Sequence, residues 1–561
     1  MPARRSALAA PGTPSRQLRL LSIPLALLLL VLTGGHTPAR ADYAQIEGSG
    51  STWSEVILRQ WIADVSPSGI KASYNGVGSS IGRKDFANYT NDFAISEIPY
   101  QGTDEYGQPD TANGREYAYM PIVAGGTAFT YHLEQAGELV TGIRLSGDTI
   151  AKVFTNQITS WADPAIKADN NGRVLPDTPI YAVVRSDGSG TTAQFTTWLN
   201  TVYPAIWQKE GRTGMTSYFP KPDGSRMISA SGSDQVMNTI AAKSGNGTIG
   251  YVEYSYPVNK GYPVVKVLNA AGFYVEPTQY NVAVALTKAT INQNPTSALY
   301  LTQILDGVYS NPDPRAYPLS SYSYMILPTG ATDRRLTTAK RQSLVDLMFY
   351  SLCDGQSQAG PFGYSPLPLN LVQAGFDQLK KLNLADGAVD LTAREVTKCN
   401  NPTFVPGDLS RNKLAEVAPA PDACNAVGAG PCDTGAGGAT GGTAGGTTGT
   451  AVDTAGTAVN AAGAAAGTTT GTTGAVAVAG AAGGDAVTYD PVTGLAVGVD
   501  AGASGASVSG ASVAGAVSTT VAARPVGGGW FFGGLAAAEL VAVILVPGLF
   551  ALRARRRGVA A

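Results

Sequence analysis

The chain has 561 residues, which is too many for one hydrophobic core, so we expect more than one structural part. Its formal net charge of −2 argues against a nucleic-acid-binding surface. The 68 glycines are unevenly distributed, so the chain has segments of different composition.

Residues 1–41 have the pattern of a secretory signal peptide. Arginines precede the apolar run Leu20–Leu32, and Ala39-Arg40-Ala41 offers small residues for cleavage before Asp42. The apolar run is shorter than the roughly 20 residues that a membrane-spanning helix needs, which argues against a retained anchor. No cysteine lies near Ala41, so lipid attachment has no acceptor there.

Residues 42–403 have the composition of a globular chain. Strand-like and helical stretches alternate along them, which is typical of an α/β fold. Two apolar runs rich in β-branched residues, Tyr119–Thr130 and Asn281–Leu286, could each form a strand that crosses between two lobes.

One Gly-rich stretch lies at a predicted strand-to-helix junction. The strand-like run Pro179–Val184 leads into Arg185–Thr192, and the apolar spacing over 195–199 predicts a helix after it. A helix N-terminus has unpaired N–H groups and a partial positive charge, so this junction is suited to an anion. Arg185 supplies a planar fork of donors for a tetrahedral oxyanion, and Asp187 is placed to hold that fork in one orientation. The alternative is a Gly-rich turn with an ordinary N-cap.

Three further stretches have related chemistry. Gly48–Trp53 is a small-residue turn before an amphipathic helix, with Thr52 as a candidate cap. Ala72–Gly82 is a strand that runs into a Gly/Ser turn, and Asn91–Glu97 is a strand with a carboxylate at its end. Donor-rich turns together with one carboxylate suit an anion that still carries a proton to donate.

In order and spacing, these motifs resemble those of the periplasmic phosphate-binding proteins of phosphate ABC transporters. The resemblance covers roughly residues 44–384 and depends on five motifs: Gly50–Trp53, Val77–Ser80, Asp92–Glu97, Arg185–Thr191 and Gly250–Tyr254. It implies an α/β, two-lobed periplasmic binding protein fold (type II-like) with two hinge strands, here Tyr119–Thr130 and Asn281–Leu286. Lobe 1 would hold about 44–122 and 287–400, and lobe 2 about 123–280.

The resemblance also implies the ligand and its contacts. Phosphate would lie in the cleft between the lobes, which would close around it. The positions that match the family's phosphate contacts are Thr52, Trp53 through its N–H, Ser79, Glu97, Arg185, Ser189, Gly190 and Thr191, with Asp187 behind Arg185. The family has an aspartate at the position of Glu97 and a phenylalanine at that of Trp53. No cofactor is implied, and the implied partners are inorganic phosphate and the transmembrane subunits of an ABC permease with their ATPase.

The four cysteines, Cys353, Cys399, Cys424 and Cys432, all lie late in the chain. With a secretory signal they favour disulfides over free thiols. Pairing neighbours, Cys353 with Cys399 and Cys424 with Cys432, is the simplest of the three connectivities that four cysteines allow. The lack of a C-x-x-C motif and the presence of only two histidines disfavour a metal site.

Residues 404–529 are predicted to be a flexible, disordered stalk, because Ala, Gly, Thr and Val dominate from about Ala415 to Ala523. A β-rich repeat domain is the alternative, but no fixed period is visible. Residues 530–552 are apolar apart from Glu539 and precede a basic tail, 553–561. This pattern predicts a single-pass transmembrane helix in the cell membrane, with the binding domain outside and the C-terminus in the cytoplasm.

We do not expect an enzyme. Gly78–Gly82 matches the G-x-S-x-G pattern of a serine nucleophile, but His132 is the only histidine left after signal cleavage to act as its base. No nucleotide-binding G-x-x-x-x-G-K-[ST] motif is present. The sequence therefore predicts a membrane-anchored extracytoplasmic protein that binds phosphate and delivers it to an ABC permease. A surface phosphate sensor or adhesin with the same binding fold is the alternative.

Overall fold

The computed structural model describes residues 43–396, 399–408 and 410–432, and the two residue pairs 488–489 and 496–497. The two pairs form β18 (Thr488–Tyr489) and β19 (Ala496–Val497), which are antiparallel and belong to a separate unit of the chain. The predicted signal peptide, transmembrane helix and basic tail lie outside the described residues. Among the helices that are described, none has both the length and the apolar composition needed to span a bilayer.

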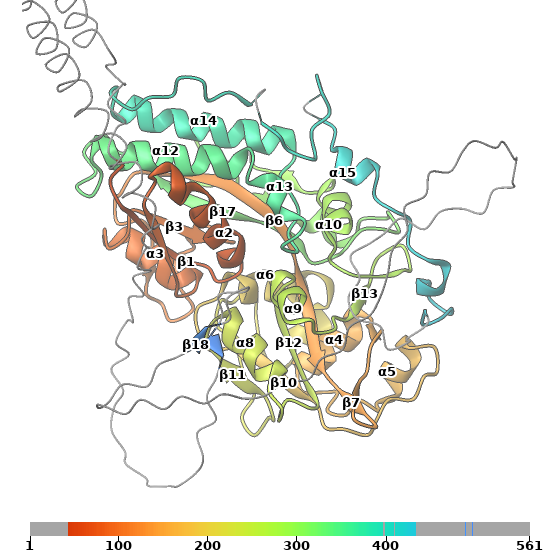
Figure 1. Cartoon of the computed structure of the whole chain (residues 1–561). Helices are drawn as coiled ribbons and strands as arrows, with labels where there is room; N and C mark the ends of the chain where they lie inside the picture. The colour runs from red at the N-terminus through yellow and green to blue at the C-terminus, as the bar shows by residue number, and fades with distance from the viewer. Residues whose placement is uncertain (1–42, 397–398, 409, 433–487, 490–495, 498–561) are drawn as a thin grey trace, which may run out of the picture. The chain divides into compact units, whose positions relative to one another are not determined.

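An eight-stranded mixed sheet forms the framework of the part up to residue 432 (Figure 1), in the order β11-β10-β12-β6-β17-β3-β1-β2. β1 pairs in parallel with β2 and β3, and β10 pairs in parallel with β11 and β12. The strands are β1 (Ile46–Gly50), β2 (Ala72–Gly76), β3 (Phe93–Ser96), β6 (Tyr117–His132), β10 (Tyr181–Arg185), β11 (Ile228–Ala230), β12 (Thr248–Glu253) and β17 (Ser320–Pro328).

Strand β6 joins the two halves of this sheet. It has 16 residues, all buried except the half-buried Tyr117. Residues 117–126 pair with β17 and residues 127–132 pair with β12, so the strand passes from one group of strands to the other. We call the group with β1, β2, β3 and β17 the first lobe, and the group with β10, β11 and β12 the second lobe. The predicted crossing strand at Tyr119–Thr130 is therefore confirmed.

The second predicted hinge strand is wrong. Asn281–Leu286 lies in helix α10 (Gln279–Leu286), which begins after Thr278, whose hydroxyl accepts a hydrogen bond from the Asn281 N–H. Every residue from Val282 to Leu286 is buried. A short apolar run that is buried on all sides has the same hydrophobic pattern as a helix and as a strand, so the pattern could not separate the two.

Helices cover the first lobe, and several of them bury a single apolar face. In α2, for example, Ile57, Leu58, Trp61 and Val65 are buried, at the spacing of one helical stripe. The long helices α12 and α14 lie side by side in Figure 1. The helices of this lobe are α2 (Glu55–Val65), η1 (Ser66–Ser68), α3 (Ser79–Ala87), α10, α11 (Asp306–Tyr309), α12 (Thr338–Leu352), α13 (Gln356–Ala359) and α14 (Leu369–Ala385).

The second lobe adds a small three-stranded sheet in the order β14-β13-β9. Its elements are β9 (Arg144–Leu145), α4 (Gly147–Phe154), α5 (Pro164–Asp169), α6 (Gly190–Val202), α7 (Pro204–Trp207), η2 (Lys209–Gly211), α8 (Gly232–Ala241), α9 (Ser255–Lys260), β13 (Lys266–Leu268) and β14 (Tyr274–Val275). Three short hairpins complete this part of the chain: β4 (Gly102–Thr103) with β5 (Pro109–Asp110), β7 (Glu134–Gln135) with β8 (Glu138–Leu139), and β15 (Thr290–Ile291) with β16 (Gln303–Ile304).

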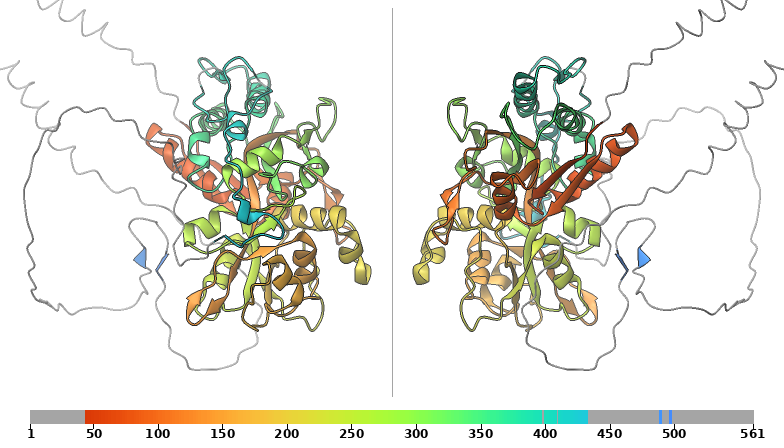
Figure 2. Two further views of the ribbon diagram at one scale, coloured as in Figure 1. Left: turned by 90° about the vertical axis from the view of Figure 1, so that its right-hand side faces the viewer. Right: turned by 90° about the vertical axis from the view of Figure 1, so that its left-hand side faces the viewer.

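Residues 410–432, which the sequence assigns to the flexible stalk, pack instead against both lobes (cyan in Figures 1 and 2). Helix α15 (Lys413–Glu416) contacts α10, and Arg315 donates hydrogen bonds to the carbonyls of Ala415 and Ala418 at 3.2 and 3.0 Å. Further along, the carbonyl of Cys424 in η4 (Ala423–Asn425) and that of Ala429 in the loop after it accept hydrogen bonds from Arg144. This part of the stalk prediction is wrong. The segment has few large side chains, but arginines of the two lobes bind its backbone carbonyls and so hold it in place.

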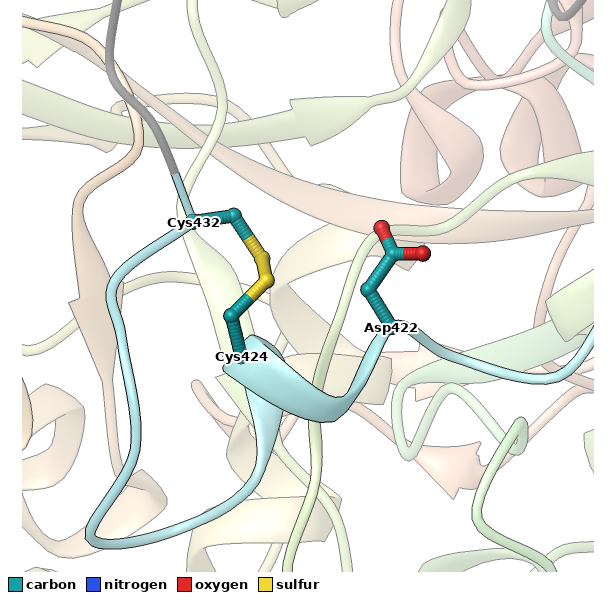
Figure 3. A group of neighbouring side chains, drawn as sticks. All are labelled: Asp422, Cys424 and Cys432. Carbon is teal, nitrogen blue, oxygen red and sulfur yellow. A yellow bond between two sulfur atoms is a disulfide. The ribbon is translucent and has the colours of Figure 1, made fainter. Parts of the chain in front are cut away.

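Both predicted disulfides, Cys353–Cys399 and Cys424–Cys432, are confirmed. Asp422 lies beside the second one (Figure 3), and the three residues are close enough together to resemble a metal site. Both thiols are consumed in the disulfide, however, so this group lacks the thiolates that would bind a metal ion.

Candidate functional site

The predicted site residues lie where strands end and helices begin. Thr52 and Trp53 follow β1, Ser79 is the first residue of α3 after β2, and Glu97 follows β3. On the second lobe, Arg185 ends β10 and residues 189–191 lie at the start of α6. All of these side chains are buried. The carboxyl ends of parallel strands are the usual position of ligand sites in α/β sheets, which explains why these distant segments converge.

Glu97 is the acceptor at the centre of the site. Its Oε2 accepts hydrogen bonds from Ser51 Oγ at 2.7 Å and Ser79 Oγ at 2.9 Å, and its Oε1 accepts one from Ser323 Oγ at 2.8 Å. Burial raises the pKa of the Glu97 carboxyl, while the three serine hydroxyls oppose that rise. The carboxylate is therefore surrounded by neutral donors.

Ser79 connects the two lobes at this point. Its hydroxyl donates to Glu97 and accepts a hydrogen bond from the Gly190 N–H at 3.1 Å, at the start of α6. Nearby, the Ser80 N–H donates to the Gly188 carbonyl at 3.0 Å. A Cβ at Gly190 would collide with the Glu97 carboxylate and the Ser79 hydroxyl, so only glycine permits this approach. The turns of the two lobes are thus in direct contact.

Arg185 is held by Asp187, as predicted. The Arg185 Nε donates to Asp187 Oδ1 at 2.7 Å, and Nη2 pairs with Oδ2. Burial alone would raise the pKa of Asp187, but the hydrogen bonds and charge of Arg185 outweigh it, and the pKa is lowered. The pKa of Arg185 is raised, because Asp187 outweighs the effect of burial. Both groups are therefore charged at neutral pH.

Ser233, at the start of α8, was not predicted. Its hydroxyl lies 3.0 Å from Thr52 Oγ1 and accepts a hydrogen bond from Arg185 Nη1 at 3.3 Å. The Ser233 N–H also donates to Thr52 Oγ1, at 3.1 Å, so Thr52 of the first lobe is tied to the second. The small polar run Ser231–Asp234 before a periodic helix could have indicated this position, since it resembles the other junctions.

Two of the groups that were predicted to contact phosphate, the Trp53 N–H and the Ser189 hydroxyl, make hydrogen bonds within the protein instead. The Trp53 N–H donates to Ser51 Oγ at 2.9 Å, so it is engaged within its own turn. The Ser189 hydroxyl caps α6 by accepting a hydrogen bond from the Thr192 N–H at 3.1 Å. Thr191 Oγ1, by contrast, is buried and has no hydrogen-bond partner among the described residues.

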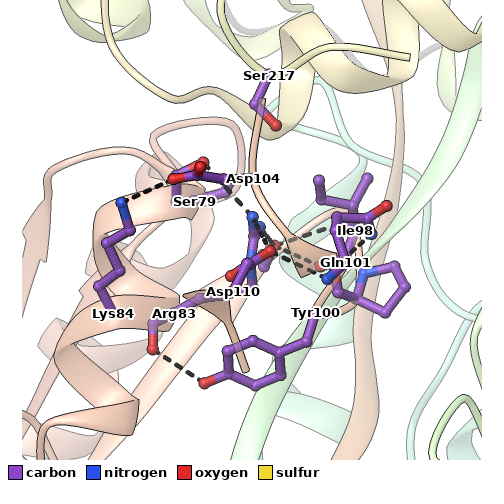
Figure 4. A network of polar contacts seen from close by, with 12 residues as sticks. Ser79, Arg83, Lys84, Ile98, Tyr100, Gln101, Asp104, Asp110 and Ser217 are labelled. Carbon is purple, nitrogen blue, oxygen red and sulfur yellow. Dashed lines mark hydrogen bonds and ion pairs between the residues drawn. The ribbon is translucent and has the colours of Figure 1, made fainter. Parts of the chain in front are cut away.

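A second contact between the lobes lies at the edge of the site (Figure 4). Arg83 and Asp110 form a buried ion pair at 2.9 Å, and Lys84 pairs with Asp104, so α3 fixes the β4–β5 hairpin. At the tip of this hairpin, Glu105 accepts hydrogen bonds from the Ser217 N–H and from Thr216 Oγ1 of the second lobe.

Within residues 43–432, the one histidine, His132, does not contact the G-x-S-x-G pattern. Both ring nitrogens of His132 are used elsewhere, with the Ile240 carbonyl at 2.8 Å and Glu134 Oε1 at 2.9 Å. Ser80, the serine of the pattern, lies instead at the contact with Gly188.

Comparisons with known proteins identify relatives of this chain. A family model described as "PBP superfamily domain" matches residues 35–340. The chain is 31% identical over 335 residues to the phosphate-binding protein PstS2 of Mycobacterium bovis, covering 58% of this chain and 83% of the relative. It is 30% identical over 344 residues to the phosphate-binding protein PstS of Xylella fastidiosa, covering 60% and 86%. A solved phosphate-binding protein with bound phosphate (PfluDING) matches 59% of this chain and 92% of its own, with 22% identity and a TM-score of 0.47.

Proposed function

Because this chain belongs to the PBP superfamily and is a PstS-like substrate-binding protein, we propose that it binds inorganic phosphate between its two lobes. The main support is the arrangement around Ser79, where the Glu97 carboxylate of one lobe lies beside the N-terminus of α6 on the other. An acceptor next to a set of donors matches an anion that carries both charge and a proton.

Each group has a distinct task in this proposal. Arg185 and the N-terminus of α6 offset the negative charge of phosphate, with Asp187 fixing the guanidinium. Thr52, Ser79, Ser189 and Thr191 would supply hydroxyls. Gly190 and Trp53 would supply N–H groups, which phosphate would take over from their present partners, Ser79 and Ser51. Thr191 Oγ1 supports the proposal in particular, since a buried hydroxyl with no partner among the described residues is suited to a ligand.

Glu97 would select the ligand by its charge. Phosphate at neutral pH still has a proton that it can donate to the carboxylate, whereas sulfate has none and would place its oxygens against a like charge. Rejection of sulfate then follows from repulsion in a site with little access to water.

We also propose the cellular role that the sequence predicts. After removal of the signal peptide at residues 1–41, the binding domain would lie outside the membrane, with its lobes at about 44–122 with 287–400 and at 123–280. A stalk running from after Cys432 to 529 would connect it to the transmembrane helix 530–552 and the cytoplasmic tail 553–561. The protein would deliver phosphate to the transmembrane subunits of an ABC permease with their ATPase. These parts are supported by sequence patterns.

Calorimetric titration tests the binding proposal. The full chain in detergent is dialysed against phosphate-free buffer and titrated with phosphate, arsenate and sulfate. We expect saturable binding of phosphate at one site and no binding of sulfate at neutral pH. A chain that binds sulfate as well as phosphate, or neither, would refute the proposal. Growth of a deletion strain on limiting phosphate then separates import from sensing, because only import limits growth there.

A further inference from the structure

Ser323 contacts the site from a strand that contributes none of the predicted site residues. It lies on β17, it is fully buried, and its hydroxyl donates to Glu97 Oε1 at 2.8 Å. Ser54 Oγ lies 3.0 Å from Ser323 Oγ on the other side. Ser323 has a single hydroxyl proton, and it is donated in the hydrogen bond to Glu97. Ser54 must therefore be the donor in the hydrogen bond between Ser54 and Ser323.

The strand geometry explains why Ser323 reaches Glu97. The register between β17 and β6 shifts between Ser323 and Tyr324, which is a β-bulge or a similar irregularity. The extra residue is Ile122 on β6, since Ser323 pairs with Val123 and Tyr324 pairs with Pro121, so β17 itself keeps its regular alternation of side chains. On the other edge of β17, Tyr324 pairs with Ser96, the residue before Glu97. Continuing this antiparallel register by one residue places Ser323 opposite Glu97, which accounts for the contact between their side chains.

The two oxygens of Glu97 are fixed in different ways. Oε2 receives Ser51 and Ser79, and Ser79 is tied to the second lobe through the Gly190 N–H. Oε1 receives Ser323, which belongs to the first lobe. The hydroxyl of Ser323 thus holds one carboxylate oxygen from within the first lobe, while the other oxygen faces Ser79, which contacts the second lobe.

We propose that Ser323 is a positioning residue that fixes the depth of the Glu97 carboxylate in the cleft and so sets how strictly the site rejects an oxyanion that has no proton. This inference depends on the proposed phosphate function. A glutamate side chain is one methylene longer than an aspartate and has more rotamers, so it needs a further contact to hold one position. Ser323 supplies that contact.

The surroundings of Glu97 explain how the loss of Ser323 would act. Nearby side chains that donate to its backbone carbonyl, Gln194 and Gln303, are uncharged. Burial raises the pKa of Tyr74 on β2, and the charges of Glu55 and Glu97 add to the rise, so Tyr74 is neutral at ordinary pH. The charged groups on adjacent elements are already paired, Arg83 with Asp110 and Arg185 with Asp187. Without Ser323 one of three opposing donors is lost, so the pKa of Glu97 rises further.

The experiment compares the full chain in detergent with Ser323→Ala, Ser323→Thr and Ser321→Ala, each titrated with inorganic phosphate in the presence of sulfate from pH 5 to 8. Ser321 is a matched control, because it is a buried serine on the same strand whose hydroxyl has no partner among the described residues. For Ser323→Ala we expect phosphate affinity to fall about 3- to 10-fold, less than the loss of a hydrogen bond made directly to the anion, because Ser323 acts through Glu97. Sulfate should begin to compete at a pH about one unit higher than in the parent.

Further variants separate positioning from a general structural role. Ser323→Thr keeps the hydroxyl and should restore the pH profile of sulfate competition. In a Glu97→Asp background the shorter carboxylate does not reach Ser323, so Ser323→Ala should then have no effect on the sulfate profile.

Two results would overturn the inference. One is a pH profile of sulfate competition that is the same for Ser323→Ala as for Ser321→Ala. The other is a shift of that profile by Ser323→Ala that stays as large in the Glu97→Asp background. If the parent binds phosphate and either of these results is found, the inference is refuted but the proposed function is not. Absence of phosphate binding in the parent would refute the proposed function and the inference together.

Discussion

Replacement of Arg185 by alanine is expected to weaken phosphate binding by about 3–5 kcal/mol, a factor of roughly 10² to 10³·⁵. The Arg185 side chain is 2% exposed, so its interactions with an anion are little weakened by water. Two consequences of the substitution add together, and each has a magnitude that follows from the geometry.

The first consequence is the loss of charged hydrogen bonds, each of which contributes about 1.5–3 kcal/mol. The second concerns Asp187. Its carboxylate would keep the hydrogen bond from the Gly232 N–H at 3.0 Å but lose its cation. If the anion binds to the Arg185 side of the cleft at a separation of roughly 5 Å from this carboxylate, the unpaired charge repels it by about 3 kcal/mol at an effective dielectric constant near 20. Partial rearrangement of the site reduces the sum to the range given.

Calorimetric titration of a small set of variants checks this reasoning. Arg185→Lys keeps the charge but loses the planar fork, so it should recover only part of the affinity. The double variant Arg185→Ala with Asp187→Asn removes the repulsion and should bind more tightly than Arg185→Ala alone. Arg173→Ala is the matched control, because Arg173 is an arginine of the second lobe that donates to the Thr141 carbonyl instead.

Two outcomes would refute the argument. If Arg185→Ala binds phosphate as tightly as Arg173→Ala, Arg185 does not contact the ligand. If the double variant binds no better than Arg185→Ala, the unpaired Asp187 carboxylate does not contribute as reasoned above.

Three further predictions concern selectivity, stability and anchoring. Glu97→Gln, which can donate as well as accept, should let sulfate compete with phosphate, whereas Glu97→Asp should not; competition titrations in which Glu97→Gln still excludes sulfate would place the selectivity elsewhere. Burial raises the pKa of Glu253 well above 4.5. Above pH 4.5 the unfolded chain therefore releases a proton that the folded chain keeps, and the free energy of unfolding falls as the pH rises from 4.5 toward the raised pKa. Glu253→Gln should therefore raise the Tm by about 1–2 °C at pH 8, the shift expected for roughly 1 kcal/mol in a folded part of this size, with little change near pH 4; an equal effect at both pH values in thermal unfolding would contradict this. Truncation before Trp530 should release a phosphate-binding protein into the medium, and its recovery in the membrane fraction would refute the predicted anchor.

Much of the site could be predicted from local sequence. Each junction, such as Gly48–Trp53 or Arg185–Thr192, combines a strand-like run, small residues and a helical pattern, and the physics of a helix N-terminus depends on those local features alone. The long apolar run at Tyr119–Thr130 likewise indicated β6, because a strand that is buried on both faces has many consecutive apolar residues. The α/β class follows from the alternation of such segments.

Other features were decided by tertiary contacts. Asn281–Leu286 is buried on all sides, and its apolar pattern fits a strand as well as it fits the helix that forms. The backbone carbonyls of 410–432 are held by Arg144 and Arg315, which lie more than 90 residues away in the sequence.

The sequence by itself determined which groups could contact an anion, because hydroxyls, glycines, one arginine and one carboxylate are properties of single positions. Only the tertiary structure decided which groups contact one another. Ser323 lies 226 residues from Glu97, and Ser233 lies 181 residues from Thr52. Neither serine lies in a local sequence pattern that indicates its partner. Sequence patterns report local conformation and burial, whereas the pairing of side chains across a cleft depends on strand order and register, which arise only when the whole sheet forms.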